Sequence, residues 1–487
     1  MATESRVPQS TPSATSARWS PRLWGLVFVL SGNMLLDALE VSVVIVALPS
    51  IGRDLHLSPA GAQWVMSGFA LGFGGLMLFG GRVVALLGRR RVYLAALAVF
   101  AAASLVAGLV SVAPVLIVTR FVKGFCAALT APTGLAIIGS TFREGPDRNR
   151  AMSIYSLFGA AGFTVGLVLS GLFTQLDWRW VFLFPAPIAL VLLAFAARLI
   201  PGDTGDEATK RRFDTLGAAC FVAAAVLVVF TIVTGPAAGW GSARVVVGFA
   251  LAAVLIAVSI HIERHSAAPL IRFGLLARGR LIRSAIGAGA LNGSFWGFLF
   301  IATFQLQSVL GWTPWQTALA FLPASVLLAL SAPSAGRMVG RFGAPWLITL
   351  GALAPPIGYI LYLSVGTSPS YVTAILPTML LVGLGFVLAF AALHIQATTG
   401  VAGPDLAMTT GMYQSSVQIG GAVMLAAVAA LLGADKAPAG ASADTALAGY
   451  RPALLLVTVV GAVGFLVAAV GVLPPFGRSR TPSAGPD

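Results

Sequence analysis

The chain has 487 residues, of which 58% are hydrophobic and 9% are charged. A soluble globular protein carries about 25% charged residues, so this composition excludes a soluble fold and predicts an all-α integral membrane protein. The formal net charge is +14, but the Arg residues fall in short loops between apolar runs, where they would orient the chain in a membrane. We therefore expect the lipid bilayer, and not a nucleic acid, as the partner of this basic chain.

The two ends of the chain predict cytoplasmic tails. Residues 1–20 are rich in Ser, Thr, Pro and Ala, a composition typical of disorder rather than of a cleaved signal peptide. Residues 476–487 form the second expected tail. Neither Cys126 nor Cys220 indicates a disulfide or a metal site, because both fall inside predicted spans.

Apolar runs bounded by Arg, Pro, Gly or Asp predict fourteen transmembrane helices. They begin near Leu23, Ala62, Val92, Pro114, Ala151, Arg179, Phe213, Val245, Ser284, Thr317, Pro345, Tyr371, Met408 and Pro452. With both termini cytoplasmic, the only Lys and Arg residues on the opposite side are Arg53, Arg179, Arg244, Lys436 and Arg451, and two more, Arg120 and Lys123, lie within spans. This asymmetry predicts a multi-pass protein of the cell inner membrane with both termini inside.

A short repeat indicates how the spans are grouped. The sequence GRVVALLG at residues 81–88 shares Gly-Arg-x-Val-x-x-x-Gly with GRMVGRFG at residues 336–343, and each follows the second helix of a presumed half. The offset leaves room for two extra helices, so we expect a six-helix bundle at 21–200, a linker with two extra helices at 201–283 and a second six-helix bundle at 284–475. The extra pair should pack at the periphery.

Several motifs resemble one known family from end to end. GGRVVALLGRRRV resembles the loop between helices two and three of the major facilitator superfamily, and RFVKGFCAALTAP is similar to its fourth-helix arginine motif. SIYSLFGAAGFTVGLVLSGLFTQLDWRWVF, FQLQSVLGWTPWQTALAFLP and GMYQSSVQIGGAV resemble later helices of its fourteen-helix drug:proton antiporters. The resemblance implies the major facilitator fold and a gating role for the loop residues Gly81, Arg82, Gly88, Arg89, Arg90, Gly336, Arg337 and Gly343.

The chain departs from this family pattern at three positions. Ala85 stands where the loop usually has an acid, Lys123 where the fourth helix usually has Gln, and Leu167 where the fifth helix usually has Pro. The family commonly places an acid seven residues before Ala-Leu-Pro, which is Glu40 here, so Asp37 is an additional acid. The glycines of the fifth helix, Gly159, Gly162, Gly166 and Gly171, predict close helix packing.

The first helix carries the residues with the clearest chemistry. Asn33, Asp37 and Glu40 follow each other at i, i+4 and i+7 and therefore share one helical face. Each mid-membrane acid costs about 2.5–3.5 kcal/mol on insertion scales, so this face must turn toward a polar interior. Arg120 and Lys123 on the fourth helix are the available cations. We expect the four charged residues to couple protons to transport from a central cavity, or else to form a static ion pair.

A second set of polar residues suits an organic substrate. An aromatic wall with amide groups is the usual lining of a pocket for a drug-sized molecule, although such residues also bond neighbouring helices. With Asn33, the expected substrate-binding residues are Asn292, Trp296, Thr303, Gln307, Gln414 and Gln418.

These expectations combine into one leading function. The chain would be a monomeric, non-enzymatic secondary transporter that exports amphipathic or cationic organic compounds, such as antibiotics, by alternating access. It would need no cofactor or metal, because the proton gradient supplies the energy. A proton-coupled importer or facilitator of a small organic solute, and a non-transporting membrane scaffold or sensor, remain as alternatives.

Overall fold

The computed structural model describes residues 19–142, 144–202, 215–265, 278–401, 404–434 and 442–472. The first part contains α1 (Pro21–Ser42), α2 (Leu48–Asp54), α3 (Pro59–Leu87), α4 (Arg89–Leu109), α5 (Ala113–Thr141), α6 (Pro146–Leu176), α7 (Trp180–Leu183) and α8 (Pro185–Leu199). It is followed by α9 (Thr215–Ala238) and α10 (Ala243–His265). The last part contains α12 (Gly279–Phe304), η1 (Gln305–Val309), α13 (Pro314–Ser331), η2 (Ala332–Ser334), α14 (Ala335–Phe342), α15 (Ala344–Tyr362), η3 (Tyr371–Ile375), α16 (Leu376–Thr398), α17 (Pro404–Ala434), α18 (Ala443–Ala448) and α19 (Arg451–Val470). Within these ranges the fold is helical and has no strand.

The all-helical membrane fold predicted from the sequence is confirmed. Twelve helices in the described ranges are long and apolar enough to cross a membrane. Two more, α3 with 29 residues and α9 with 24 residues, are long but are not among these twelve, so the count of fourteen stays a prediction. Most of the two predicted tails, and residues 203–214 and 266–277 of the predicted linker, lie outside the described residues.

Local sequence signals explain where several helices begin. Proline occupies the first turn of α1, α3 and α13, where a missing N–H costs nothing. The residue before each start, Ser20, Ser58 or Thr313, accepts a hydrogen bond from a backbone N–H of the first turn. Thr313 and Gln316 form a complete capping box. These caps satisfy backbone N–H groups that have no partner within the helix.

Glycines let α6 approach two other helices closely, as predicted. A Cβ at Gly162 would lie 2.6 Å from the carbonyl oxygen of Leu35 on α1, and one at Gly166 would lie 2.1 Å from Ser42 Oγ. At the far end of α6, a Cβ at Gly171 would lie 2.5 Å from the Cβ of Ala318 on α13. Such distances are too short for any side chain, so these positions require glycine.

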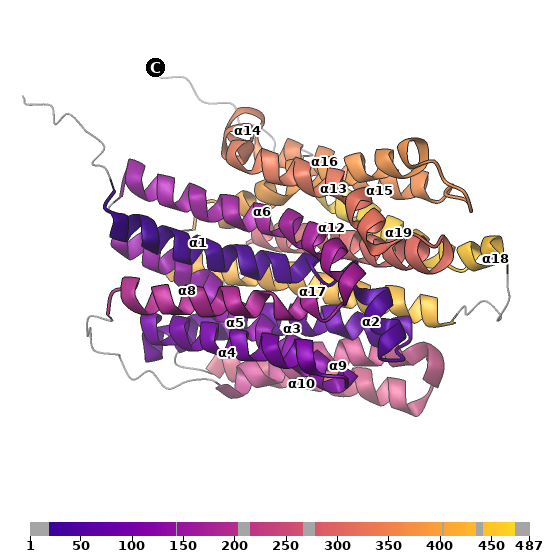
Figure 1. Cartoon of the computed structure of the whole chain (residues 1–487), viewed down its shortest axis with the longest axis horizontal. Helices are drawn as coiled ribbons and strands as arrows, with labels where there is room; N and C mark the ends of the chain where they lie inside the picture. The colour runs from indigo at the N-terminus through magenta and orange to yellow at the C-terminus, as the bar shows by residue number, and fades with distance from the viewer. Residues whose placement is uncertain are drawn as a thin grey trace, which may run out of the picture.

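The first and last parts of the chain form two halves that meet along two seams. One seam joins α3 to α17 and the other joins α6 to α13. The helix α9 packs against both α3 and α17, and α10 packs against α9 at the edge of the bundle (Figure 1). The predicted peripheral position of this pair is confirmed, and α9 additionally covers the first seam.

Candidate functional site

Glu40 on α1 is held by two cations from α5. Arg120 donates from Nη1 to Glu40 Oε2, and Lys123 Nζ lies 2.6 Å from Glu40 Oε1. Arg120 also donates from Nη2 to the main-chain oxygen of Glu40 at 2.9 Å and from Nε to the main-chain oxygen of Val65 on α3 at 2.9 Å. All three guanidinium nitrogens are therefore engaged, and one side chain joins α1, α3 and α5.

Aromatic rings enclose this charged cluster. The guanidinium of Arg120 lies 4.7 Å from the ring centre of Phe69, and Lys123 Nζ lies 4.8 Å from that of Phe100. Glu40, Arg120 and Lys123 are at most 1% exposed. The cluster is therefore cut off from water. In such a protein interior each electrostatic contact is stronger than in water, and each unpaired charge costs more free energy.

Two glycines allow this geometry by bringing α3 and α5 together. A Cβ at Gly72 would lie 2.2 Å from the main-chain oxygen of Phe121, and a Cβ at Gly124 would lie 2.2 Å from that of Phe69. Neither site has room for any side chain. The close approach places the carbonyl of Val65 within reach of Arg120.

In the described structure Asp37 is bound by neutral side chains rather than by Arg120 or Lys123. Its Oδ2 accepts hydrogen bonds from Asn33 Nδ2 at 3.0 Å and from Thr130 Oγ1 at 2.9 Å. The described contacts of Asp37 thus come from neutral donors, one of them four residues earlier on the same helix. Asn33, which we expected to bind substrate, donates its side-chain hydrogen bond to Asp37 in this structure. Thr130 was missed, although its i+7 spacing from Lys123 puts it on the same face of α5.

The expected exposure of the two acids to a central cavity is wrong for this conformation. Asp37 is 3% exposed and Glu40 is not exposed. Helices α1, α3 and α5, with rings from α4 and α7, close around the carboxylates inside the first half. The formal charges of Asp37, Glu40, Arg120 and Lys123 cancel, so one added proton leaves this enclosed group with a net charge of one.

The polar residues of the second half lie along α12, η1 and α17. Asn292 Nδ2 donates to the main-chain oxygen of Val417 on α17 at 2.9 Å, and Trp296 packs against Gly421, where a Cβ would lie 2.7 Å from the indole. Gln307 Nε2 donates to the main-chain oxygen of Val46 at 2.9 Å.

The rest of this set is also buried or half-buried. Thr303 is buried and its Oγ1 has no hydrogen-bond partner in the described structure. Gln418 is buried against Gly74, and Gln414 is half-buried one turn earlier. Of this set, Gln307 and Gln418 contact the first half, and the contact of the whole set with substrate stays a prediction.

The two repeated turns have the same backbone geometry. Gly88 has φ 88° and ψ 146°, and Gly343 has φ 79° and ψ 143°. Each ends one helix and precedes the next, and each donates its N–H to a carbonyl four residues back. The positive φ values explain why both positions are glycine.

The flanking residues of these turns have different surroundings. Arg90, one residue after Arg89 at the start of α4, donates from Nη2 to the main-chain oxygen of Ala197 at 2.6 Å. Gly81, Gly336 and Arg337 lie at exposed positions, whereas the side chains of Arg82 and Ala85 lie outside the described residues. The gating role of these residues stays a prediction.

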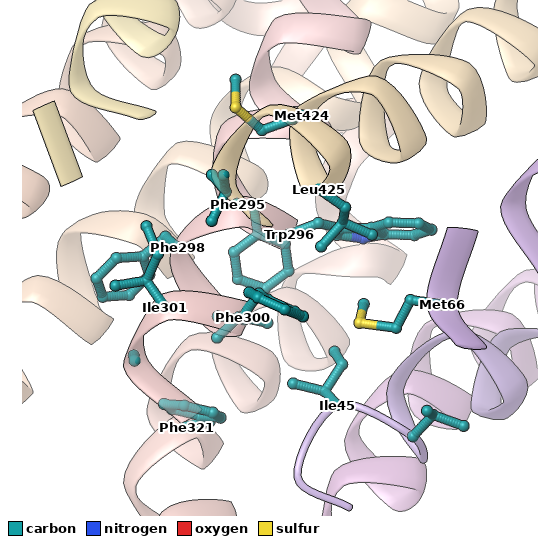
Figure 2. Close-up of a cluster of buried hydrophobic side chains, with 14 of the residues drawn as sticks. Ile45, Met66, Phe295, Trp296, Phe298, Phe300, Ile301, Phe321, Met424 and Leu425 are labelled. Atoms are coloured by element: carbon teal, nitrogen blue, oxygen red, sulfur yellow. The ribbon is translucent and has the colours of Figure 1, made fainter. Parts of the chain in front are cut away.

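The halves are closed at the end of the molecule that carries α2. The Gln307–Val46 hydrogen bond crosses between the halves there, and so does the contact of Gly171 with Ala318. Figure 2 shows Ile45 and Met66 of the first half lying beside the aromatic cluster of α12, which belongs to the same buried core. This apolar layer seals one end.

The opposite end of the α6–α13 seam is hollow. A cavity of about 570 Å³ lies between the first turns of α6, from Asn149 to Leu157, and the residues Ala332 and Pro333 of η2. One end closed and the other hollow is the arrangement of a transporter that opens to one side at a time. Within the described residues, no group of three or more His, Cys, Asp or Glu side chains is placed to hold a metal ion.

Comparison with known proteins agrees with this architecture. The chain matches the model of the Major Facilitator Superfamily over residues 30–425. It is 33% identical over 478 residues to the puromycin resistance protein pur8 of Streptomyces alboniger, covering 95% of this chain and 93% of that protein. It is 32% identical to the cephamycin export protein CmcT of Amycolatopsis lactamdurans, covering 97% of each chain, and 32% identical to the lincomycin resistance protein of Streptomyces lincolnensis, covering 85% of each.

Solved structures share the fold at low sequence identity. The nucleoside transporter NupG superposes with a TM-score of 0.65 at 12% identity, covering 92% of this chain and 100% of that one. The xylose transporter XylE from E. coli, in a partially occluded inward-open conformation, has a TM-score of 0.61 at 15% identity and covers 94% of this chain and 100% of that one. The chain is a non-enzymatic, multi-pass membrane transporter that belongs to the Major Facilitator Superfamily.

Proposed function

We propose that this transporter exports amphipathic organic compounds of the antibiotic type in exchange for protons. The observation that carries the proposal is Glu40, an acid without exposed surface that contacts both Arg120 and Lys123. Ionisable residues inside membrane spans are costly, and their usual role is in ion or proton pathways. Relatives named for puromycin resistance, cephamycin export and lincomycin resistance support antibiotics as the substrate class.

The proposed cycle uses the proton to break the enclosed cluster. When Glu40 is protonated, its attraction to the two cations weakens, so the contacts that join α1 to α5 weaken as well. The first half then repacks and the closed end opens, whereas loss of the proton restores the cluster. Asp37, hydrogen-bonded one turn away, is the second proposed proton carrier. The proton gradient is the energy source, and the cycle needs no cofactor or metal.

The proposed setting is the cell inner membrane, with both termini cytoplasmic and with α3 and α9 completing fourteen spans. In this orientation the cavity between α6 and η2 opens to the cytoplasm, and the end closed by Gln307 and Val46 faces outward. The positive-inside distribution of Lys and Arg supports this orientation. We propose a monomer as the working unit.

Proton flux in proteoliposomes tests the proposal. Purified protein is reconstituted with an entrapped pH indicator, and puromycin, lincomycin or a cephamycin is added on one side. Substrate and protons moving in opposite directions support antiport, whereas movement in the same direction would establish the importer instead. Substrate movement without any proton flux would leave a facilitator.

A further inference from the structure

The cavity between α6 and η2 has a size and depth suited to an organic ligand. Its volume of about 570 Å³ lies within the range of about 300–1,000 Å³ typical of pockets for drug-sized molecules. Its lining on α6 runs from Asn149 to Leu157, which at 1.5 Å per residue is about 12 Å along the helix. A molecule with a head and a body can therefore lie along α6.

The other seam between the halves is held by direct contacts of α3 with α17. There, Ser415 Oγ donates to the main-chain oxygen of Gly74 at 2.6 Å, and a Cβ at Gly74 would lie 2.5 Å from that of Gln418. Helix α9 packs over this contact from outside.

The lining of the cavity is itself amphipathic. Asn149, Ser153 and Ser156 form a polar stripe on α6 at i, i+4 and i+7, and Arg150 stands beside its start. Leu157 lies deeper along the helix, and Ala332 and Pro333 form the facing wall. The apolar Met152 and Ile154 lie between these polar residues, so polar and apolar side chains alternate along α6 while the charged Arg150 lies near its start.

The described lining of the cavity carries a positive charge, from Arg150. Among the described residues that line the cavity, Arg150 is the only formally charged one, and none of them carries a carboxylate. The neighbouring acid Asp147 accepts a hydrogen bond at 3.0 Å from the indole of Trp19. The guanidinium of Arg150 lies 4.9 Å from the ring centre of Trp19 and 5.0 Å from that of Trp24, so two indoles hold it in place.

We propose that this cavity is a recognition site for amphipathic organic anions, with Arg150 as the counter-charge for the head group. The serine and asparagine side chains supply hydrogen bonds to the head, and the apolar wall takes the body. This inference rests on the proposed export function and narrows it, because it favours anionic over cationic amphipathic substrates.

A matched series of fluorescent probes tests the site. Dansylglycine, dansylamide and dansylcholine share one ring system and carry a carboxylate, no charge or a quaternary ammonium. Each is titrated against the full chain in phosphatidylcholine nanodiscs without a proton gradient. We expect dansylglycine to bind at least about 10-fold more tightly than dansylcholine. Equal affinity, or preference for dansylcholine, would overturn the proposal.

Substitutions in the cavity assign the preference to Arg150. Arg150→Gln should weaken dansylglycine binding about 10-fold and leave dansylamide within about two-fold, because a charge-assisted hydrogen bond is lost. Arg148→Gln is the control, since Arg148 pairs with Glu144 at 3.3 Å and is not among the lining residues. Wild-type dansylglycine affinity in folded Arg150→Gln would contradict the assignment.

A second variant keeps the test decisive if Arg150→Gln disturbs the packing of the two indoles. Ser153→Asp adds a carboxylate at an exposed position of the lining, where Ser153 Oγ bonds only the main-chain oxygen of Asn149. It should reduce the affinity for dansylglycine and raise that for dansylcholine. An unchanged order of the three probes would show that they bind elsewhere.

Two further comparisons complete the test. The first distinguishes a lipid head group from a freely diffusing compound as the natural anion, and the second distinguishes failure of this site from failure of proton-coupled export. Nanodiscs that contain phosphatidylglycerol should weaken dansylglycine binding if a lipid head group is the natural occupant, and should leave it unchanged if the occupant is a freely diffusing compound. Both outcomes support an anion site. Because these titrations use no gradient, their failure would leave proton-coupled export standing, and a failed flux assay would leave this site standing.

Discussion

Arg120 reaches Glu40 twice, through the carboxylate and through the main-chain oxygen of the same residue. The first contact depends on the charge of the acid, and the second does not. Protonation of Glu40 would therefore weaken one bond while the other still ties Arg120 to α1. This arrangement allows the cluster to loosen and re-form without the two helices separating completely.

The stability of the fold should depend more on Arg120 than on Lys123. Arg120→Met removes contacts to Glu40 and to Val65, whereas Lys123→Met removes a single described hydrogen bond. Loss of one partner from a buried ion pair costs about 3–5 kcal/mol when the other stays unpaired, and less here because one cation remains in either variant. Thermal unfolding in detergent should rank wild type above Lys123→Met and Lys123→Met above Arg120→Met. The reverse order would show that Lys123 is the main anchor.

The pH dependence of transport should change when Arg120 is replaced. A cation beside a carboxylate favours its charged form, so removal of one of the two cations in Arg120→Ala should slow proton release from Glu40. Exchange should recover in part at more alkaline pH. Arg120→Lys should perform better than Arg120→Ala but below wild type, because a point charge does not replace three directed hydrogen bonds. A wild-type pH profile for Arg120→Ala would leave Lys123 as the tuning cation.

Close packing of α6 on α1 makes Gly162 sensitive to a single methyl group. Gly162→Ala places a carbon within 2.6 Å of the Leu35 oxygen, so the two helices must move apart and the melting temperature should fall. Overpacking of this kind typically costs about 1–3 kcal/mol. Gly81→Ala is the control, because nothing lies within 4 Å of a Cβ at that helical position. Equal melting temperatures for the two variants would refute this account of the α1–α6 contact.

The hydrogen bond from Gln307 to Val46 should help to hold one end of the transporter closed. Gln307→Ala removes this link between the halves. Spin labels at Leu172 and Leu319, exposed neighbours of the Gly171–Ala318 contact, report the separation of α6 and α13 at that end. Electron spin resonance should show a larger fraction of long distances in Gln307→Ala.

Another glutamine at the same end provides the control for this measurement. Gln316 bonds only within its own capping box, with Thr313, so Gln316→Ala should leave the distances between the labels unchanged. Equal increases of the label distances in both variants would indicate that any substitution at this end separates α6 from α13. Unchanged distances in Gln307→Ala would show that the Gln307–Val46 hydrogen bond does not hold this end closed.

Much of the fold could be predicted because membrane spans and charged loops leave strong sequence signals. The predicted helix starts lie within five residues of those in the structure, for example Ala151 for α6, which begins at Pro146. The contact of Arg120 with Glu40 was expected because two buried opposite charges need each other. The partners of Asp37 were not, since a neutral donor such as Thr130 looks like any other small residue of an apolar helix.

The conformation of the site could not be predicted from the sequence either. A transporter sequence encodes several states, so the burial of Glu40 depends on which end of the bundle is closed. Gln307 illustrates the same difficulty. Its amide suits a substrate, yet in this state it binds the main-chain oxygen of Val46. The cavity beside Arg150 arises from residues far apart in sequence and has no local signature.

The most direct test of the central claim is the effect of Glu40→Gln on substrate-driven proton flux. Gln keeps the size and hydrogen-bonding groups of the side chain but carries no titratable proton. We expect Glu40→Gln proteoliposomes to lose proton-coupled substrate movement while the protein still inserts and folds. Glu144→Gln, which replaces an exposed acid paired with Arg148, should keep wild-type flux. Wild-type coupled flux in Glu40→Gln would contradict the assignment of Glu40 as the proton carrier.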